Sequence, residues 1–187
     1  MVKEGGVHLK ENWIDVEDYL PEESGRISEK PFGAYFYGVL LAIRFVGSNR
    51  TCTYKGLRFR RLKTGTEVDN LVDENQTPFN KWVWKIDHLA PDVYEVVAWT
   101  WLPKPNDPRW IRDKMPEELG YTKNILGMEM TTVLALARSN AAPNAELVIE
   151  MRNRIFCPKP YGEGRWQWSL EEFSKVVAWM PQPKYER

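Results

Sequence analysis

One four-residue word occurs twice in this chain, and its recurrence constrains the fold more than any other sequence feature. Val-Val-Ala-Trp stands at 96–99 and again at 176–179, and each copy leads into a Pro-x-Pro segment. A match of this length carries little weight alone. The useful test is whether other features recur in the same order along the chain.

Other features do recur in that order. They are a Trp-Ile start followed by Pro-Glu-Glu at 13–23 and 110–118, an apolar run ending in arginine at 39–44 and 133–138, an Arg-x-Arg pair at 58–60 and 152–154, and a Trp-x-Trp pair at 82–84 and 166–168. The offset between partners falls from 97 residues at Trp13 and Trp110 to 80 at Val96 and Val176, as loop shortening in a second copy would produce. The exit segments also match with an offset of 78, and a two-residue slip preserves the facing of a strand.

We therefore predict two tandem similar units. The first covers residues 1–106, including an N-terminal tail at 1–12 and a surface loop at 64–80, and the second covers residues 107–187. Asn, Asp and Pro at 106–108 favour a turn and interrupt a helix, so they form the predicted joint between the units.

Most of the recurring segments have the composition of strands. Residues 32–47 and 51–63 are rich in aromatic and branched side chains, and turn residues separate them. Residues 127–139 could form a helix by their Met, Leu and Ala content, but their partner in the first unit is strand-like, so we expect a strand. The predicted fold is α+β and mainly β, with two similar small antiparallel sheets, Trp-rich cores and short helical turns.

Two short helical segments are expected beside these strands. Asp15 to Asp18 has the pattern of a capped turn that Pro21 terminates, and residues 169–177 can hold a short helix that begins at Ser169.

Composition limits the classes of partner and compartment. Lysine plus arginine and aspartate plus glutamate number 26 each, so no net field draws the chain to nucleic acid or to an anionic membrane. No run of about 18 apolar residues occurs and the first residues lack an apolar signal core, so we expect a soluble chain that is not exported. The two cysteines, Cys52 and Cys157, are too few for a disulfide framework or a cysteine-based zinc site.

Signals of enzymatic chemistry are sparse. The sequence contains two histidines, His8 and His88, and no phosphate-binding glycine loop, nucleophile elbow or paired-histidine zinc motif. His88 directly follows Asp87, and neighbours in sequence do not face each other on a strand. We interpret His88 as a loop or capping residue, and we predict a protein that is not an enzyme and uses no cofactor or metal.

Four arginines form the first group of candidate binding residues. Arg58 and Arg60 share one strand face beside an aromatic residue, and Arg152 and Arg154 repeat that pair. Cations interleaved with aromatic rings suit single-stranded nucleic acid, although the same pattern is typical of a solvated sheet face.

Two tryptophans form the second group. Trp101 and Trp110 flank the predicted joint, where they could form an exposed surface, a packed interface or the wall of a ligand pocket. The pairs Trp82-x-Trp84 and Trp166-x-Trp168 place both rings on one strand face, which favours a core position for them.

The first unit begins with Trp-Ile-Asp-Val-Glu-Asp-Tyr-Leu-Pro-Glu-Glu at 13–23, and the second ends with Val-Val-Ala-Trp-Met-Pro-Gln-Pro at 176–183. These motifs resemble a small domain-of-unknown-function family of phages and enterobacterial prophages, which begins with W-I-x-V-x-x-x-L-P-E and ends with V-T-H-W-M-P-L-P. A single domain of that family is shorter than this chain, which fits two copies or one expanded copy. The family's histidine before the final Trp is Ala178 here, so a role that depends on it does not carry over.

The resemblance implies a phage or prophage protein in a bacterial cytoplasm, without an established activity. Together with the sparse chemistry and the balanced charge, it favours a non-enzymatic protein that docks on a host or phage protein, with a host defence or nucleic-acid enzyme as a candidate target. Two alternatives stay open: single-stranded nucleic-acid binding through the arginines, and a pocket that sequesters a nucleotide signal. No membrane partner is expected.

Overall fold

The structure is a computed structural model that describes residues 13–26, 34–61, 80–142, 144–159, 162 and 164–185. The chain divides into two compact units: unit 1 comprises residues 1–102 with 183–187, and unit 2 comprises residues 103–182. The tail predicted at 1–12 and nearly all of the loop predicted at 64–80 lie outside the described residues.

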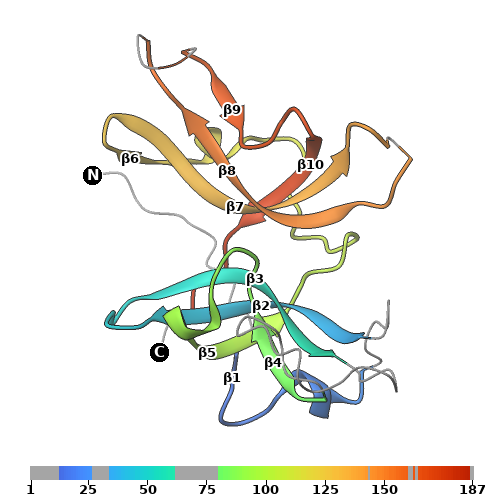
Figure 1. Ribbon diagram of the computed structural model, residues 1–187. Helices are drawn as coiled ribbons and strands as arrows, with labels where there is room; N and C mark the ends of the chain where they lie inside the picture. Colours follow the sequence, from blue (N-terminus) through green and yellow to red (C-terminus); the bar gives the residue numbers. More distant parts are fainter. Residues whose placement is uncertain are drawn as a thin grey trace. The chain divides into compact units, whose positions relative to one another are not determined.

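Unit 1 contains a five-stranded antiparallel sheet with the order β1-β5-β2-β3-β4 (Figure 1). Its strands are β1 (Ile14–Asp15), β2 (Ala34–Phe45), β3 (Thr51–Arg61), β4 (Trp82–Lys85) and β5 (Tyr94–Trp101). The long hairpin of β2 and β3 is therefore the centre of the unit, as its aromatic and branched residues predict.

Unit 2 contains a second antiparallel sheet with the order β10-β7-β8-β9, and β6 pairs with the first residues of β7. Its strands are β6 (Lys123–Ile125), β7 (Met128–Ser139), β8 (Val148–Phe156), β9 (Trp166–Trp168) and β10 (Ser174–Pro181). The strand expected at 127–139 is confirmed despite its helix-favouring composition. Strand partners on both sides of β7 satisfy its backbone, and these tertiary contacts override the local propensity.

The helical structure of the described residues consists of three short 3₁₀ turns, which are η1 (Pro21–Ser24), η2 (Pro91–Val93) and η3 (Pro116–Leu119). Each begins with proline, whose fixed φ and missing N–H suit the first helical position. The turn expected at Asp15 to Asp18 is present, because the N–H groups of Asp18 and Tyr19 donate to the Asp15 carbonyl, and it ends before Pro21, which begins η1. The helix expected at 169–177 is wrong, because a turn there leads into β10. No described helix has the length and apolar character that a membrane crossing requires.

The Val-Val-Ala-Trp segments occupy the same place in both sheets. Trp99 lies opposite Leu41 on β2, and Trp179 lies opposite Ala135 on β7. In both sheets the register shifts at the second valine of the segment, a bulge that adds one residue to β5 and to β10. Of the two alignments that the sequence allows, the register agrees with the offset of 80.

The two tryptophans are almost completely buried, and each donates a hydrogen bond to the loop in front of a 3₁₀ turn. Nε1 of Trp99 donates to the carbonyl of Tyr19 at 2.7 Å, and Nε1 of Trp179 donates to the carbonyl of Lys114 at 2.6 Å. A buried indole N–H requires a partner, so these bonds hold η1 and η3 against their sheets.

The 3₁₀ turns themselves are closed in the same way. A glutamate carboxylate accepts a hydrogen bond from the backbone N–H three residues earlier, Glu23 from Leu20 at 2.6 Å and Glu118 from Met115 at 2.5 Å. Each turn ends at a glycine with a left-handed φ, 69° at Gly25 and 72° in the second turn, which a residue with a Cβ rarely adopts.

The larger core cluster of unit 1 lies on one face of its sheet, where β2 contributes alternate residues Val39, Leu41 and Ile43, and a smaller cluster of Ala42, Val97 and Ala98 lies on the other face. β7 repeats this alternation with Val133, Ala135 and Ala137. The tryptophans of β4 pack against the core of unit 1 while only partly buried. The predicted mainly β fold is therefore confirmed, and an aromatic cluster supports the Trp-rich core of unit 1.

The last described residues pack on unit 1. The carbonyl of Pro183 accepts a hydrogen bond from the Thr53 hydroxyl at 2.6 Å, and the Tyr185 hydroxyl donates to Asp15 at 2.6 Å. Trp13 donates from Nε1 to the carbonyl of Lys184 at 3.0 Å. The boundary predicted from sequence places residues 183–185 in the second unit, whereas these bonds join them to the first.

We expect Trp179→Phe to lower the free energy of unfolding by about 2–3 kcal/mol, because it removes the indole donor to Lys114 and leaves a void in the core. Urea unfolding followed by far-UV circular dichroism measures the change. Trp166→Phe is the control: this half-buried ring stacks on Phe156 at 5.4 Å, and its replacement should cost less than about 1 kcal/mol. Equal losses in both variants would contradict the anchoring role of Trp179.

Candidate binding surfaces

Arg58 lies on β3 and is enclosed by its own unit. Its side chain is paired with Glu22 of η1, with Nη2 at 2.7 Å from Oε1 and Nε within 3.1 Å of both carboxylate oxygens. The guanidinium also stacks over the Trp84 ring, 4.6 Å from its centroid. Only 9% of Arg58 is exposed, so the predicted nucleic-acid contact has most of its hydrogen-bonding capacity already engaged.

Arg154 has the same surroundings in unit 2. Its Nη2 lies 2.8 Å from Oε1 of Glu117, and its guanidinium lies 5.1 Å from the centroid of Trp168. The sequence comparison matches Arg58 with Arg152, but the contacts match Arg58 with Arg154. The predicted match of Arg58 with Arg152 is therefore wrong by two residues. A shift of two keeps each side chain on the same strand face, so the sequence pattern does not reveal it.

Arg152 has a different environment, with 3% of its surface exposed. It donates to the Ser169 carbonyl at 2.5 Å and to the Ser174 hydroxyl, and Nη2 lies 2.5 Å from a carboxylate oxygen of Glu150. Arg152 lies opposite Val133 on β7, and in unit 1 the residue opposite the equivalent Val39 on β2 is Gly56. Arg152 is thus a buried cross-link of unit 2 with no arginine counterpart.

Arg60 is half-buried on β3, opposite Trp82 on β4 and Tyr35 on β2. Its Nε atom is buried and, among the described residues, has no hydrogen-bond partner. The four predicted arginines therefore divide into three that carboxylates bind and one that lies between aromatic side chains. They do not form one basic face.

Trp101 lies in an aromatic cluster of unit 1. Its ring meets Trp99 edge-on at 4.9 Å and Tyr37 at 6.0 Å, and the guanidinium of Arg26 stacks over it at 4.0 Å. Trp110 belongs to unit 2, where it is 4% exposed and donates from Nε1 to the Lys104 carbonyl at 2.8 Å. Trp110 is a buried structural residue, and it is not an exposed platform.

Two titratable groups depart from their ordinary behaviour. Hydrogen bonds from Arg109 lower the pKa of the Asp107 carboxyl, with the two side chains 2.8 Å apart. Burial raises the pKa of the Tyr94 hydroxyl, against a smaller lowering by a hydrogen bond with the Ile86 backbone. His88 stands exposed in a turn with a φ of 66°. In the described part of the chain, no three His, Cys, Asp or Glu side chains converge as metal ligands would.

Apolar side chains gather on one face of unit 2 at the β6–β7 hairpin. Ile125 lies opposite Met128, and Met130 lies opposite Ile155 on the neighbouring strand. Residues directly opposite on antiparallel strands share a face, and so do alternate residues along one strand, so these four side chains lie on one face of β6, β7 and β8, which we call the apolar face. The exposed Lys123 lies opposite Met130 and borders it. Ile125 is exposed and the other three apolar side chains are half-buried, so water reaches the apolar face.

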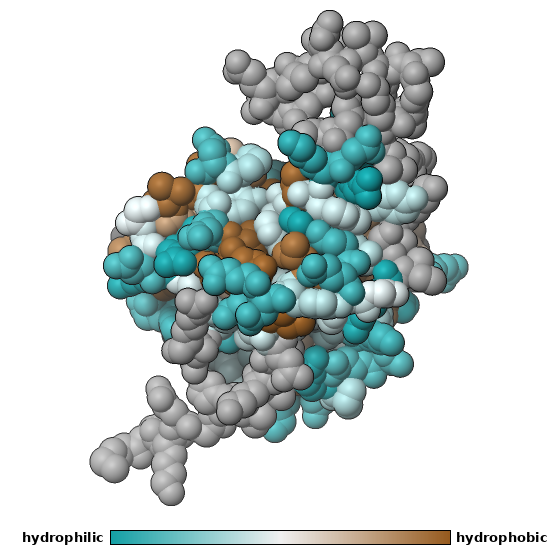
Figure 2. Space-filling model, turned by 90° about the horizontal axis from the view of Figure 1, so that it is seen from below, coloured by the Kyte–Doolittle hydropathy of each residue, from teal (hydrophilic) through white to brown (hydrophobic). Residues whose placement is uncertain are grey.

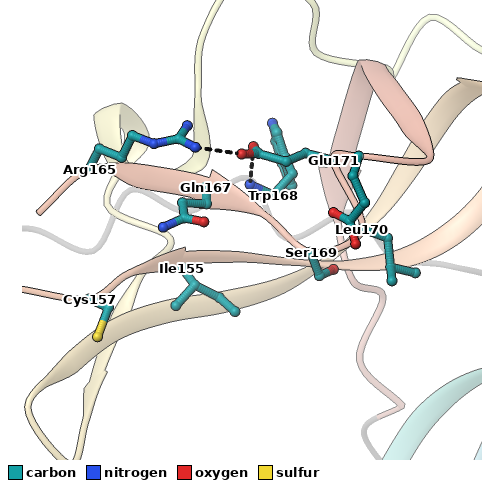
Figure 3. Close-up of a pocket in the computed structure, with 9 residues that line it drawn as sticks. Ile155, Cys157, Arg165, Gln167, Trp168, Ser169, Leu170 and Glu171 are labelled. Atoms are coloured by element: carbon teal, nitrogen blue, oxygen red, sulfur yellow. Dashed lines mark hydrogen bonds and ion pairs between the residues drawn. The ribbon is translucent and has the colours of Figure 1, made fainter. Parts of the chain in front are cut away.

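A pocket of about 790 Å³ adjoins the apolar face at Ile155 (Figure 3). Ile155, Cys157 and Gln167 point to the same side of β8 and β9, while Arg165 forms an ion pair with Glu171 at 2.9 Å across the rim. The pocket's lining comprises Ile155, Cys157, Arg165, Gln167, Trp168, Ser169, Leu170, Glu171 and Glu172. The composition is mixed, with an aliphatic floor and a charged edge.

Among the described residues of unit 2, Leu170 and Phe173 are also exposed within one turn, and in unit 1 the exposed apolar residues are dispersed. On the face shown in Figure 2, apolar side chains alternate with hydrophilic ones and form no single broad patch. In unit 1 the large exposed apolar side chains include Tyr19, Val46 and Val93, from three separate turns. Single apolar residues of this kind are normal on a protein surface. The sequence reading did not identify the apolar face, whose visible signal is the methionine pair at alternate positions 128 and 130.

Comparison of the chain with protein-family models, curated proteins and solved structures found no match.

We expect Glu117→Gln to lower the free energy of unfolding by about 1–3 kcal/mol, because it leaves the Arg154 guanidinium largely buried without its counter-charge. The matched control is Glu95→Gln, which breaks the exposed pair with Arg44 at 3.4 Å and should cost less than about 0.5 kcal/mol. Urea unfolding of both variants at neutral pH tests this, and a similar small loss in each would mean that the Arg154 pair is not structural.

We expect Asp107→Asn to reduce stability at neutral pH and to lose that effect in acid. The pKa of Asp107 is lower in the folded protein than in the unfolded chain, where it is about 3.9. The stabilisation is thus complete above about pH 4 and disappears as the pH falls through the folded pKa. Urea midpoints of both proteins at a series of pH values measure it, and a difference that grows on acidification would contradict the assignment.

Proposed function

We propose that this chain is a non-enzymatic binding protein that docks on another protein through the apolar face of unit 2. The group of Ile125, Met128, Met130 and Ile155 carries the proposal, since Ile125 lies opposite Met128 and Met130 lies opposite Ile155 on one face of three strands, where water reaches them. Burial of such a group against a partner yields free energy without charge complementarity. The two methionines add adaptability, because an unbranched thioether side chain can repack against different surfaces.

The state of the arginines favours protein docking over nucleic-acid binding. Affinity for nucleic acid comes largely from cations that replace condensed counterions on phosphates. Arg58 and Arg154 are paired with Glu22 and Glu117, and Arg152 is buried against Glu150. A phosphate would have to displace a carboxylate at each of these positions, which removes the expected gain.

We also propose that the two units arose by duplication. Three structural features that do not depend on one another recur in both units and support this idea. They are the bulge before each buried tryptophan, the indole hydrogen bond to the loop before a Pro-Glu-Glu turn, and the Glu–Arg–Trp cluster. On this view the shared contacts maintain the scaffold, and the side chains that differ between the units carry the function.

The proposed setting is a phage or prophage protein that acts in the bacterial cytoplasm, with a host defence or nucleic-acid enzyme as the target. The resemblance of both chain ends to the phage domain family supports this setting, and so does a docking surface without catalytic groups. The proposal makes the protein a stoichiometric modulator of its partner.

The test is capture from a bacterial lysate on the immobilised protein, with nuclease treatment and at salt from about 0.05 to 0.5 M. We expect a protein partner that survives nuclease and whose binding changes little with salt, since apolar burial is not screened. Met130→Gln should weaken capture, whereas Val148→Thr, at an exposed site outside the apolar face, should not. Recovery of nucleic acid with a steep loss at high salt would overturn the proposal.

A further inference from the structure

Leu126 stands at the tip of the β6–β7 hairpin, between Ile125 and Gly127. It is 95% exposed, and its φ is 51° while that of Gly127 is 84°. Two successive residues with positive φ between paired strands are the pattern of a type I′ turn, for which Asn-Gly is the favoured sequence. The side chain of Asn124 fastens the turn by accepting a hydrogen bond from the Gly127 N–H at 3.2 Å.

Leucine is a poor choice for folding at this position. The left-handed conformation brings its Cβ against the backbone, and asparagine tolerates that conformation better. The other described non-glycine residues with positive φ are Asn80 and His88 of unit 1, both of the tolerant kind, and Leu170 of unit 2, with a φ of 58° beside the pocket. The exposed Val46 shows the usual solution for an apolar turn residue, since the neighbouring Gly47 takes the positive φ of 79°.

We propose that Leu126 is the anchor of the docking surface and inserts into an apolar pocket of the partner protein. This inference rests on the proposed docking function and adds the residue that the partner recognises. Leu126 projects from a two-residue turn, and the Ile125–Met128 pair flanks its base on the apolar face. A convex tip of this size fits a concave apolar pocket, and the short turn presents it with little conformational entropy to lose.

The hairpin favours a protein pocket over a lipid surface. Glu129 is exposed and lies opposite Asn124 on the other side of the same hairpin, so insertion into a bilayer would carry a carboxylate toward the acyl region. The tip also lacks the tryptophan and the cluster of cations that are typical of membrane-binding segments. A protein pocket can admit the leucine and leave Glu129 in water.

The deciding variant is Leu126→Asn, because folding and binding should respond in opposite directions. The turn becomes easier to form, so the urea midpoint should stay equal or rise. Affinity for the partner captured by the wild-type protein and identified by mass spectrometry should fall by about 30-fold or more, which corresponds to about 2 kcal/mol. Val46→Asn is the matched control, an exposed apolar turn residue of unit 1 whose loss should leave the affinity unchanged.

The outcomes separate this inference from the function on which it rests. Undiminished capture by Leu126→Asn would overturn the anchor and leave protein docking intact, and an equal loss in Val46→Asn would overturn its specificity. A lowered urea midpoint would overturn the claim that leucine is disfavoured by the turn. Wild-type protein that captures no protein, but cosediments with vesicles of neutral and anionic phospholipids, would overturn both proposals.

Discussion

A buried indole N–H is the constraint on which each sheet depends. Trp99 and Trp179 lie in cores that water does not reach, so their donors must find acceptors within the protein. The acceptors are carbonyls in front of the Pro-Glu-Glu turns, and this single requirement fixes where each turn crosses its sheet. Once the turn is in place, its first glutamate reaches the arginine of the neighbouring strand, and that arginine stacks on a tryptophan. The local order of each unit follows from that hydrogen bond.

The same contacts determine which surfaces remain for function. Two of the arginines predicted to bind a ligand instead hold the 3₁₀ turns in place, because a partly buried guanidinium is stable only with a carboxylate beside it. In unit 2, aliphatic side chains are exposed to solvent at the hairpin of β6 and β7, where the sheet extends past its buried half. Because three of the four predicted arginines are already paired with carboxylates, the candidate binding site lies instead at Ile125, Leu126 and the two methionines. A surface of this kind recognises shape and apolar complementarity.

Particular residues show how far sequence reasoning reached. The strands of the long hairpins follow from composition and alternation, and they were predicted. The tryptophans at 82, 84, 166 and 168, for which a core position was expected, are only half-buried. The helix at 169–177 was predicted wrongly, because residues from Ser174 onward pair with β7 as the start of β10, a contact that the local sequence does not reveal. The pairing of Arg58 with Arg152 was also wrong, since alternation repeats every two residues and the partner carboxylate is more than 35 positions away in the sequence. The buried position of Trp110 was not predicted, because it depends on the Lys104 carbonyl that accepts a hydrogen bond from its indole.

The sequence alone determined the mainly β character, the strand pattern and the order of the recurring motifs, since these depend on side-chain periodicity and turn chemistry within short segments. Only the tertiary structure decided which arginine meets which glutamate, and that Gly56 and Arg152 share one register position. It also decided that Leu126 stands in water with a left-handed backbone. These facts depend on contacts between residues that are distant in the chain and on the φ angle at one turn, and a local pattern of residue types encodes neither.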